Sequence, residues 1–192
     1  MNSLLKRLLT FLIITLFLAS CIGLALFFAT MKKIPYLQIG GKVQEDFYGI
    51  SDSERTNYLQ NHQEELEYTS IDDIYFLINH KDISHTQGHI WIDACSIFSD
   101  EEKNFVIKQV SLRTSNDAIL FENKDLNLKI SSVPANGDIY APTDPILTYT
   151  KSEDWYYKRN DLILVVDIEQ NGEIKTISYG VEVRIARSHR YL

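Results

Sequence analysis

The chain has 192 residues, of which 45% are hydrophobic and 11% aromatic, with four prolines and a formal net charge of −7. This composition is typical of a folded protein and excludes a disordered tail. The acidic balance argues against nucleic acid as a partner, because proteins that bind nucleic acid use basic side chains to neutralise phosphates.

The first predicted element is an apolar helix near the N-terminus. No charged side chain occurs between Leu8 and Met31, and two basic residues flank the run on each side. At about 1.5 Å per residue such a helix reaches roughly 36 Å, enough to cross a hydrocarbon core of about 30 Å. The pattern predicts a single-pass signal anchor over residues 1–33, through which the chain contacts the membrane.

A second interpretation of the same segment involves Cys21. Residues 18–21, Leu-Ala-Ser-Cys, resemble the lipobox of bacterial lipoproteins, in which the cysteine is lipidated and becomes the mature N-terminus. The residues after Cys21 are as apolar as those before it, whereas a mature lipoprotein usually continues into a polar tether. We favour the uncleaved span, with lipidation at Cys21 as the alternative. Both cases place the remaining domain at a membrane. With the span, we expect a single-pass protein of the bacterial inner membrane whose C-terminal domain lies in the periplasm or outside the cell.

The residues after the anchor predict a linker and then a helix. Residues 34–50 fit a juxtamembrane linker or a first short strand, broken at Gly40–Gly41. Ser51 stands three residues before Glu54, which is the spacing of a capping box. A helix is therefore expected from about residue 52 to residue 67.

The rest of the chain shows mostly β patterns. Residues 70–80, SIDDIYFLINH, fit a short helix or a buried strand, and the spacing of the isoleucines favours the helix. From His89 onward, about seven short runs rich in β-branched and aromatic residues alternate with polar turns. Asn171–Gly172 between two runs predicts a type I′ hairpin. We expect a mainly β (α+β) fold, an antiparallel β-sandwich or open barrel of about seven strands, in an extracytoplasmic domain of residues 51–192.

The charge beyond the anchor bears on the partner. All 26 acidic residues lie there, against 15 basic ones, which leaves about −11. Cys95 has apolar, strand-like neighbours, so we interpret it as a buried structural thiol. The expected partner is another envelope or secreted protein, and a basic one fits the charge.

A group of histidines is the only candidate metal site in the sequence. His80, His85 and His89 lie close together, with Asp82 between them, and a loop could bring three nitrogen ligands and a carboxylate together. The spacing is not that of HExxH. Solvent-facing loop histidines are the simpler account, so no cofactor or metal is expected, and a metal-dependent hydrolase is the alternative.

One aromatic stretch could take part in recognition. Trp155, Tyr156 and Tyr157 stand between acidic and basic residues, and Trp, Tyr and Arg are enriched at binding hot spots. Packing within the core is the competing role. No catalytic motif is found, so the sequence favours a non-catalytic protein-binding module over an enzyme. An immunity-type inhibitor of a cationic toxin and an accessory subunit of an envelope complex are the two forms considered.

Overall fold

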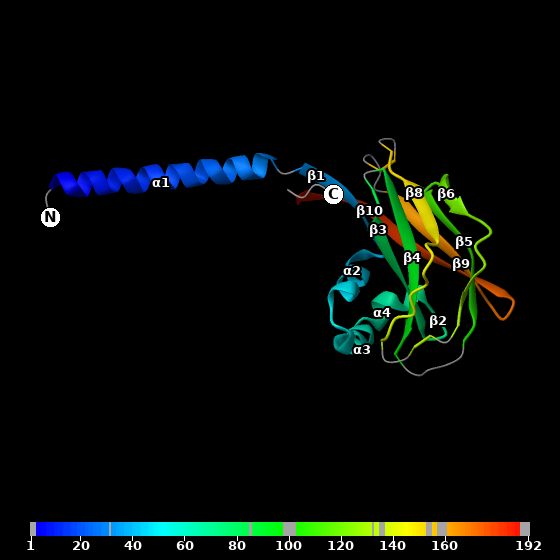
Figure 1. The fold of residues 1–192 in the computed structure, drawn as a ribbon. Coiled ribbons are helices and arrows are strands. Elements are labelled where there is room, and N and C mark those ends of the chain that lie inside the picture. The colour runs from blue at the N-terminus through cyan, green and yellow to red at the C-terminus, as the bar shows by residue number, and fades with distance from the viewer. Residues whose placement is uncertain are drawn as a thin grey trace. The chain divides into compact units, whose positions relative to one another are not determined.

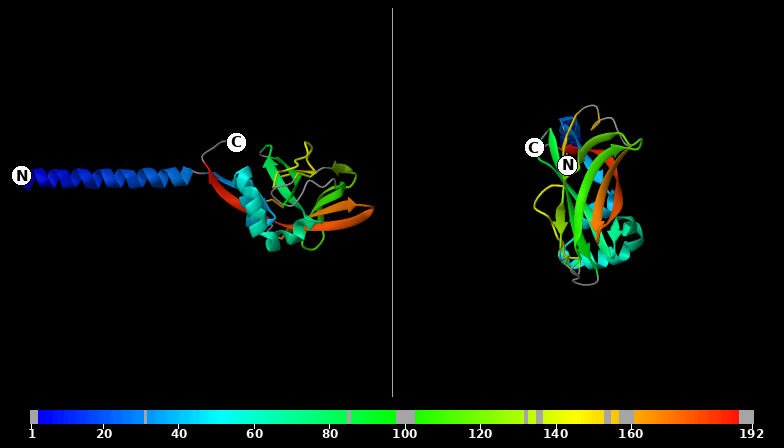
Figure 2. Two further views of the ribbon diagram at one scale, coloured as in Figure 1. Left: turned by 90° about the horizontal axis from the view of Figure 1, so that it is seen from below. Right: turned by 90° about the vertical axis from the view of Figure 1, so that its right-hand side faces the viewer.

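The computed structural model describes residues 3–30, 32–84, 86–97, 103–131, 133–134, 137–152, 155–156 and 161–188. The chain divides into two compact units, residues 1–34 with 185–192 and residues 35–184. Figures 1 and 2 show the elements of both units.

The first unit contains helix α1 (Ser3–Thr30). The side chains described in it, residues 12–25, are exposed. Among the residues whose backbone and side chains the structure describes, no helix is long and apolar enough to cross a membrane.

The second unit is mainly β, as predicted, and its strands form two antiparallel sheets. One of the sheets curves into a half-barrel. The larger sheet has the order β1 (Lys32–Ile39), β10 (Glu173–Ser188), β9 (Leu162–Gln170), β5 (Phe105–Thr114) and β6 (Ile119–Asn123), with β7 (Leu128–Ile130) also paired to β5. The smaller sheet has the order β2 (Ser70–Ile71), β3 (Ile74–Asp82), β4 (Gln87–Ser96) and β8 (Leu147–Thr150).

The seven runs expected from residue 89 onward are the strands β4 to β10. The Asn171–Gly172 hairpin is also confirmed: it joins β9 to β10, with Gln170 opposite Glu173 and φ angles of 54° and 83° at the two turn residues. Both angles are positive, as a type I′ turn requires. Period-2 patterns and turn residues are local signals, so these strands and this hairpin can be predicted from the sequence.

The helix expected within residues 70–80 is wrong, because this segment is the hairpin β2–β3. Residues 74–78 are buried in succession: Ile74, Phe76 and Ile78 lie in one hydrophobic cluster, and the side chains between them lie in another. A strand that is covered on both faces has no polar alternation, so its sequence resembles a buried helix.

The turn of this hairpin consists of two aspartates. Asp72 and Asp73 have φ angles of 50° and 64°, a conformation that aspartate tolerates better than most residues. Gln170 donates a hydrogen bond of 2.6 Å to the Asp72 carboxylate, and this bond is the main reason that the pKa of Asp72 is lowered. The turn of the smaller sheet is thereby tied to strand β9 of the larger one.

The helices follow β1 and precede β2 in the chain, and together they form one layer against the smaller sheet. They are α2 (Gly41–Gly49), α3 (Asp52–Asn61) and α4 (Gln63–Leu66), followed by the 3₁₀ turn η1 (Glu67–Thr69). The capping box is confirmed: the Glu54 carboxylate accepts a hydrogen bond of 3.3 Å from the Ser51 N–H, and the Ser51 side chain accepts one from the Glu54 N–H. The Ser51 hydroxyl also donates to the Glu54 carboxylate at 2.6 Å. Of the two forms expected for residues 34–50, a linker or a first short strand, the strand is present as β1, which ends before Gly40, and α2 follows it.

Two hydrophobic cores hold the layers together. The main core lies between the two sheets and contains residues such as Leu37, Phe76 and Val166. The second core lies between the smaller sheet and the helices, where Phe47 of α2 and Leu59 of α3 meet side chains of β3 and β4. Figure 1 shows α2, α3 and α4 beside these two strands.

A buried hydrogen bond joins the two sheets directly. The Tyr179 hydroxyl on β10 donates to the Phe76 carbonyl on β3 at 2.8 Å, and the Tyr179 side chain is fully buried. Replacing Tyr179 with phenylalanine leaves that carbonyl unpaired in the core, and we expect a loss of about 1–3 kcal/mol in the free energy of unfolding. Urea denaturation measures this loss. The control is Tyr140→Phe, which removes an exposed bond of 3.4 Å to the Lys129 carbonyl; equal losses for both variants would contradict the prediction.

Candidate functional site

The outer face of the smaller sheet changes from apolar to polar where the helical layer ends. On this face Tyr75, Leu77 and Cys95 are buried under the helices. Cross-strand partners lie on the same face of a sheet, and the next pair along is Asn79 with Trp91. The sheet thus carries a polar and aromatic surface that the helices do not cover.

Asp93 lies at this boundary and is almost completely buried. Its side chain faces outward from β4, opposite Leu77, and is 4% exposed. The carboxylate accepts a hydrogen bond of 2.9 Å from the Tyr48 hydroxyl of α2 and another from the Asn79 side chain. Burial raises the pKa of Asp93, against the two hydrogen bonds and the positive charge of Arg55, which lower it. The pKa of Tyr48 is raised well above its usual value, first by burial and then by the Asp93 charge.

A pocket of about 270 Å³ opens over this carboxylate. We call it the face pocket, and its lining residues are Asn79, Lys81, Trp91, Asp93, Ala141 and Pro142. The loop that closes one side is attached to the sheet, since the Trp91 indole N–H lies 3.5 Å from the Thr143 carbonyl and Tyr140 forms an antiparallel bridge with Ala94. The face pocket is therefore framed by strands and by an attached loop.

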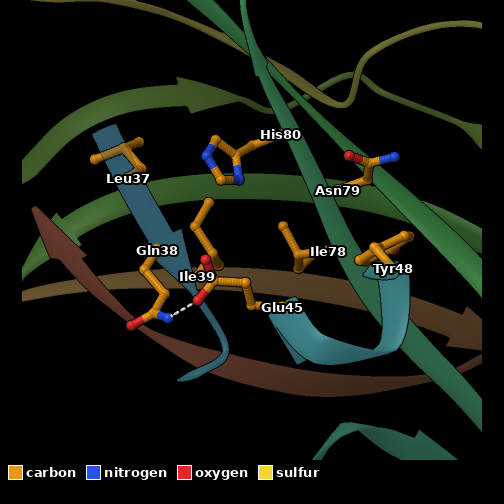
Figure 3. Close-up of a pocket in the computed structure, with 8 residues that line it drawn as sticks. All are labelled: Leu37, Gln38, Ile39, Glu45, Tyr48, Ile78, Asn79 and His80. Atoms are coloured by element: carbon orange, nitrogen blue, oxygen red, sulfur yellow. Dashed lines mark hydrogen bonds between the residues drawn. The ribbon is translucent and has the colours of Figure 1, made fainter. Parts of the chain in front are cut away.

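A second pocket, of about 190 Å³, lies between strand β1 and strand β3. Figure 3 shows this seam pocket, which is lined by Leu37, Gln38, Ile39, Glu45, Tyr48, Ile78, Asn79 and His80. Among these residues, the Gln38 amide donates a hydrogen bond to the Glu45 carboxylate. Asn79 and Tyr48 line this pocket and also donate hydrogen bonds to Asp93.

The seam pocket exists because one edge of β3 is paired by side chains instead of a strand. Strand β2 pairs with β3 only at residues 74 and 75. Farther along this edge, the Ile78 N–H donates to the Gln44 side-chain carbonyl at 3.0 Å. Gln44 occupies the space that a side chain at Gly40 would need, because a Cβ there would lie 2.3 Å from the Gln44 Cδ. Glycine at position 40 thus leaves room for the Gln44 side chain, which binds the unpaired edge of β3 at Ile78.

His80 points into the seam pocket (Figure 3), and burial lowers its pKa; Asp82 and Glu45 partly oppose this shift, and Lys151 adds to it. The folded state then binds fewer protons at His80 than the unfolded state does. Stability therefore falls as the pH drops through the ordinary histidine pKa of about 6.5 and stops falling below the lowered pKa. We expect His80→Gln to flatten this part of the stability profile, measured by urea unfolding between neutral and mildly acidic pH. An unchanged slope in the variant would contradict the assignment.

The histidines of the predicted metal alternative do not form one ligand set. His80 is paired with Ile90, whose side chain is in the main core, whereas His89 is paired with Lys81. Since successive residues of a strand alternate in direction, His80 and His89 lie on opposite faces of the sheet, and one ion cannot bind both. His85 lies outside the described residues. Among those that the structure describes, no three His, Cys, Asp or Glu side chains are placed to hold a metal ion.

The aromatic stretch is buried where it is described. Trp155 is 4% and Tyr156 0% exposed, and both rings pack against Tyr149 in the main core. This corresponds to the core-packing role considered for them. Tyr157 lies outside the described residues, so a part for this stretch in binding stays a prediction.

The two cysteines differ in their surroundings. Cys21 is exposed on α1 and Cys95 is buried. Burial raises the pKa of the Cys95 thiol to about 12, so the thiolate is scarce at neutral pH and a structural role fits. Lipidation of Cys21 stays a prediction.

The helical layer is strongly acidic on its surface. Between residues 41 and 69 there are two basic residues, and the guanidinium of one of them, Arg55, pairs with Asp52 and lies 5.4 Å from the Phe47 ring centre. The segment holds seven acidic residues, all of them exposed: Glu45, Asp46, Asp52, Glu54, Glu64, Glu65 and Glu67. Tyr48 of this layer donates a hydrogen bond to Asp93, which lines the face pocket.

Sequence reasoning missed Tyr48, Asn79, Trp91 and Asp93 as a group. One signal was present: Trp91 and Asp93 are two residues apart in a strand-like run, so they face the same side. Tyr48 and Asn79 come from other elements, and only the packing of α2 on the sheet brings them to Asp93.

Comparisons with known proteins add little to this picture. No protein-family model and no curated protein matches the chain. A solved structure described as that of a protein from Archaeoglobus fulgidus is similar with 12% identity and a TM-score of 0.35, over 64% of this chain and 99% of that chain. A likeness at that TM-score supports no conclusion about fold or function.

Proposed function

We propose that this chain is a membrane-anchored, extracytoplasmic, non-catalytic module that binds a basic protein through its acidic helical layer. The observation that carries the proposal is the exposure of all seven carboxylates of that layer, next to only two basic residues. A surface of one charge sign steers an oppositely charged partner and selects against others. An immunity-type inhibitor that captures a cationic toxin is the form of this function that the charge favours.

The anchor part of the proposal rests on residues 8–31, which contain no charged side chain. A lone span holds a binding domain at the membrane surface, where it meets proteins that arrive there. Intact mass of the membrane-extracted protein tests this part, with wild type compared to Cys21→Ser. We expect a full-length mass that is the same in both. A mass that corresponds to loss of residues 1–20 and addition of acyl chains would show that Cys21 is lipidated and that the span is cleaved.

The binding part is tested with the full chain in zwitterionic nanodiscs and cytochrome c as a folded basic protein. Acetylated cytochrome c, in which the lysine charges are removed, is the matched ligand control. We expect binding at low ionic strength that weakens as salt is added and that is absent with the acetylated protein. Equal binding of both forms would overturn the proposal.

A pair of variants locates the surface. In the first, four carboxylates of the layer are neutralised: Asp46→Asn, Glu64→Gln, Glu65→Gln and Glu67→Gln. The matched control neutralises four exposed carboxylates elsewhere, Asp117→Asn, Asp125→Asn, Asp144→Asn and Glu173→Gln, and so changes the net charge equally. We expect at least a tenfold loss of affinity in the first variant and less than a threefold loss in the control. Equal losses would mean that net charge, and not the layer, drives binding.

A further inference from the structure

The carboxylate of Asp93 is buried without an ion-pair partner in the part of the chain that the structure describes. Its hydrogen-bond partners, Tyr48 and Asn79, are neutral, and among the described residues no Lys, Arg or His forms an ion pair with it. An ionised carboxylate taken out of water is unfavourable unless a positive charge compensates it. Arg55 lowers the pKa of Asp93 through its positive charge, but its guanidinium pairs with Asp52 and its charge does not offset the burial that raises this pKa.

The space over this carboxylate is open and has an aromatic wall. Asp93 and Trp91 both line the face pocket of about 270 Å³. They are two residues apart on β4 and point to the same side of the sheet. A cation above the face of a tryptophan ring is attracted by its quadrupole, and the attraction is stronger where water is excluded. A buried carboxylate beside an indole ring is thus suited to an ammonium or guanidinium group.

We propose that the face pocket binds a single cationic side chain, a lysine or arginine of the partner, with its charge at Asp93 and its stem against Trp91. This inference deepens the proposed function and rests on it for the identity of the partner. The acidic layer would act at long range, and the pocket would supply the short-range anchor. Buried anchors of this kind carry most of the affinity of an interface, whereas exposed rim charges mainly affect association rates.

Lys81 provides a second test, because removing its charge should change affinity in the opposite direction to removing the charge of Asp93. Its side chain is exposed and lines the same pocket, so its ammonium repels a cationic ligand and would attract an anionic one. Removing the Lys81 charge should strengthen cation binding, and removing the Asp93 charge should weaken it. An anion site would show the opposite pair of effects.

The test uses the full chain in zwitterionic nanodiscs and small probes. N-acetyl-arginine amide and N-acetyl-lysine amide are titrated while the Trp91 indole N–H resonance, assigned with Trp91→Phe, is followed by NMR. N-acetyl-citrulline amide has nearly the shape of the arginine probe without the charge. We expect saturable shifts with the two cations and none with citrulline. Binding of citrulline equal to that of arginine would overturn the proposal.

Three variants complete the experiment. Asp93→Asn is expected to weaken binding of the arginine probe at least fivefold, and Lys81→Gln to strengthen it about twofold. Trp91→Leu is expected to weaken binding of the arginine probe about threefold, as followed through the NMR signals of the Asn79 side-chain amide. This variant keeps the buried Asp93, so it provides the test if Asp93→Asn does not fold. Unchanged affinity in Asp93→Asn, or in Trp91→Leu, contradicts the assignment.

The outcomes separate this inference from the proposed function. If cytochrome c binds through the acidic layer but the arginine probe leaves Trp91 unaffected, the pocket assignment fails and the function stands. If the probe binds at Asp93 but neutralising the layer does not affect cytochrome c, the site stands and the role of the layer fails.

Discussion

Replacing Lys151 with methionine is expected to lower the free energy of unfolding by about 3–5 kcal/mol, because it removes one partner of a buried ion pair. The Lys151 Nζ lies 2.6 Å from a carboxylate oxygen of Asp82, and the two side chains are 7% and 18% exposed. The other oxygen of Asp82 accepts a hydrogen bond of 3.0 Å from the Tyr149 hydroxyl. Without Lys151 the Asp82 charge is left with one neutral donor in a site that water hardly reaches.

The double variant Asp82→Asn, Lys151→Met is the control for this effect. It removes both charges together, so no uncompensated charge stays buried, and we expect it to be more stable than Lys151→Met alone. Urea unfolding of the wild type, the two single variants and the double variant gives the coupling free energy. Strictly additive losses would show that the pair contributes packing only.

Replacing Gly88 with alanine is expected to destabilise the domain by about 3 kcal/mol, at the upper end of the usual range for overpacking. A Cβ at Gly88 would lie 2.3 Å from both the Cζ and the hydroxyl oxygen of Tyr149. That ring cannot move aside easily, because it is fully buried and its hydroxyl is bound to Asp82. It also packs against Trp155, with 5.7 Å between ring centres.

Gly180→Ala is the matched control, since Gly180 is also a strand glycine. A Cβ there meets no atom within 4 Å. Alanine at such a position reduces the entropy of the unfolded chain, so we expect no loss and a small gain in stability. Thermal unfolding compares the two variants, and similar midpoints would contradict the role assigned to Gly88.

These two predictions concern the same polar cluster at one end of the main core. Tyr149 is the shared member: its ring covers Gly88 and its hydroxyl holds the Asp82 carboxylate that pairs with Lys151. The Tyr156 ring completes the cluster, with its centre 5.2 Å from the Lys151 Nζ. Tyr156, which comes from a stretch with the composition of a binding hot spot, thus covers an ammonium group of the same chain.

The sequence by itself determined the features that depend on neighbouring residues. The strands β4 to β10 follow from period-2 patterns, the Asn171–Gly172 hairpin from the need for positive φ, and the start of α3 from Ser51 and Glu54. Each of these signals lies within a few residues of the element that it predicts.

Only the tertiary structure decided the features that depend on pairing between distant segments. The first half of strand β3 resembles a helix in sequence because residues 74–78 are buried on both faces. One face packs in the main core, where Phe76 meets Phe105 of β5, and the other packs under α2 and α3. The separation of His80 from His89 follows from the register of β3 against β4, which no local pattern specifies. Asp93 is a candidate site because α2 packs on the sheet so that Tyr48 contacts Asp93, whereas Trp91 lies outside the region that the helices cover. Burial, register and contact between layers are set by the whole fold, and for that reason the candidate site could not be read from the chain.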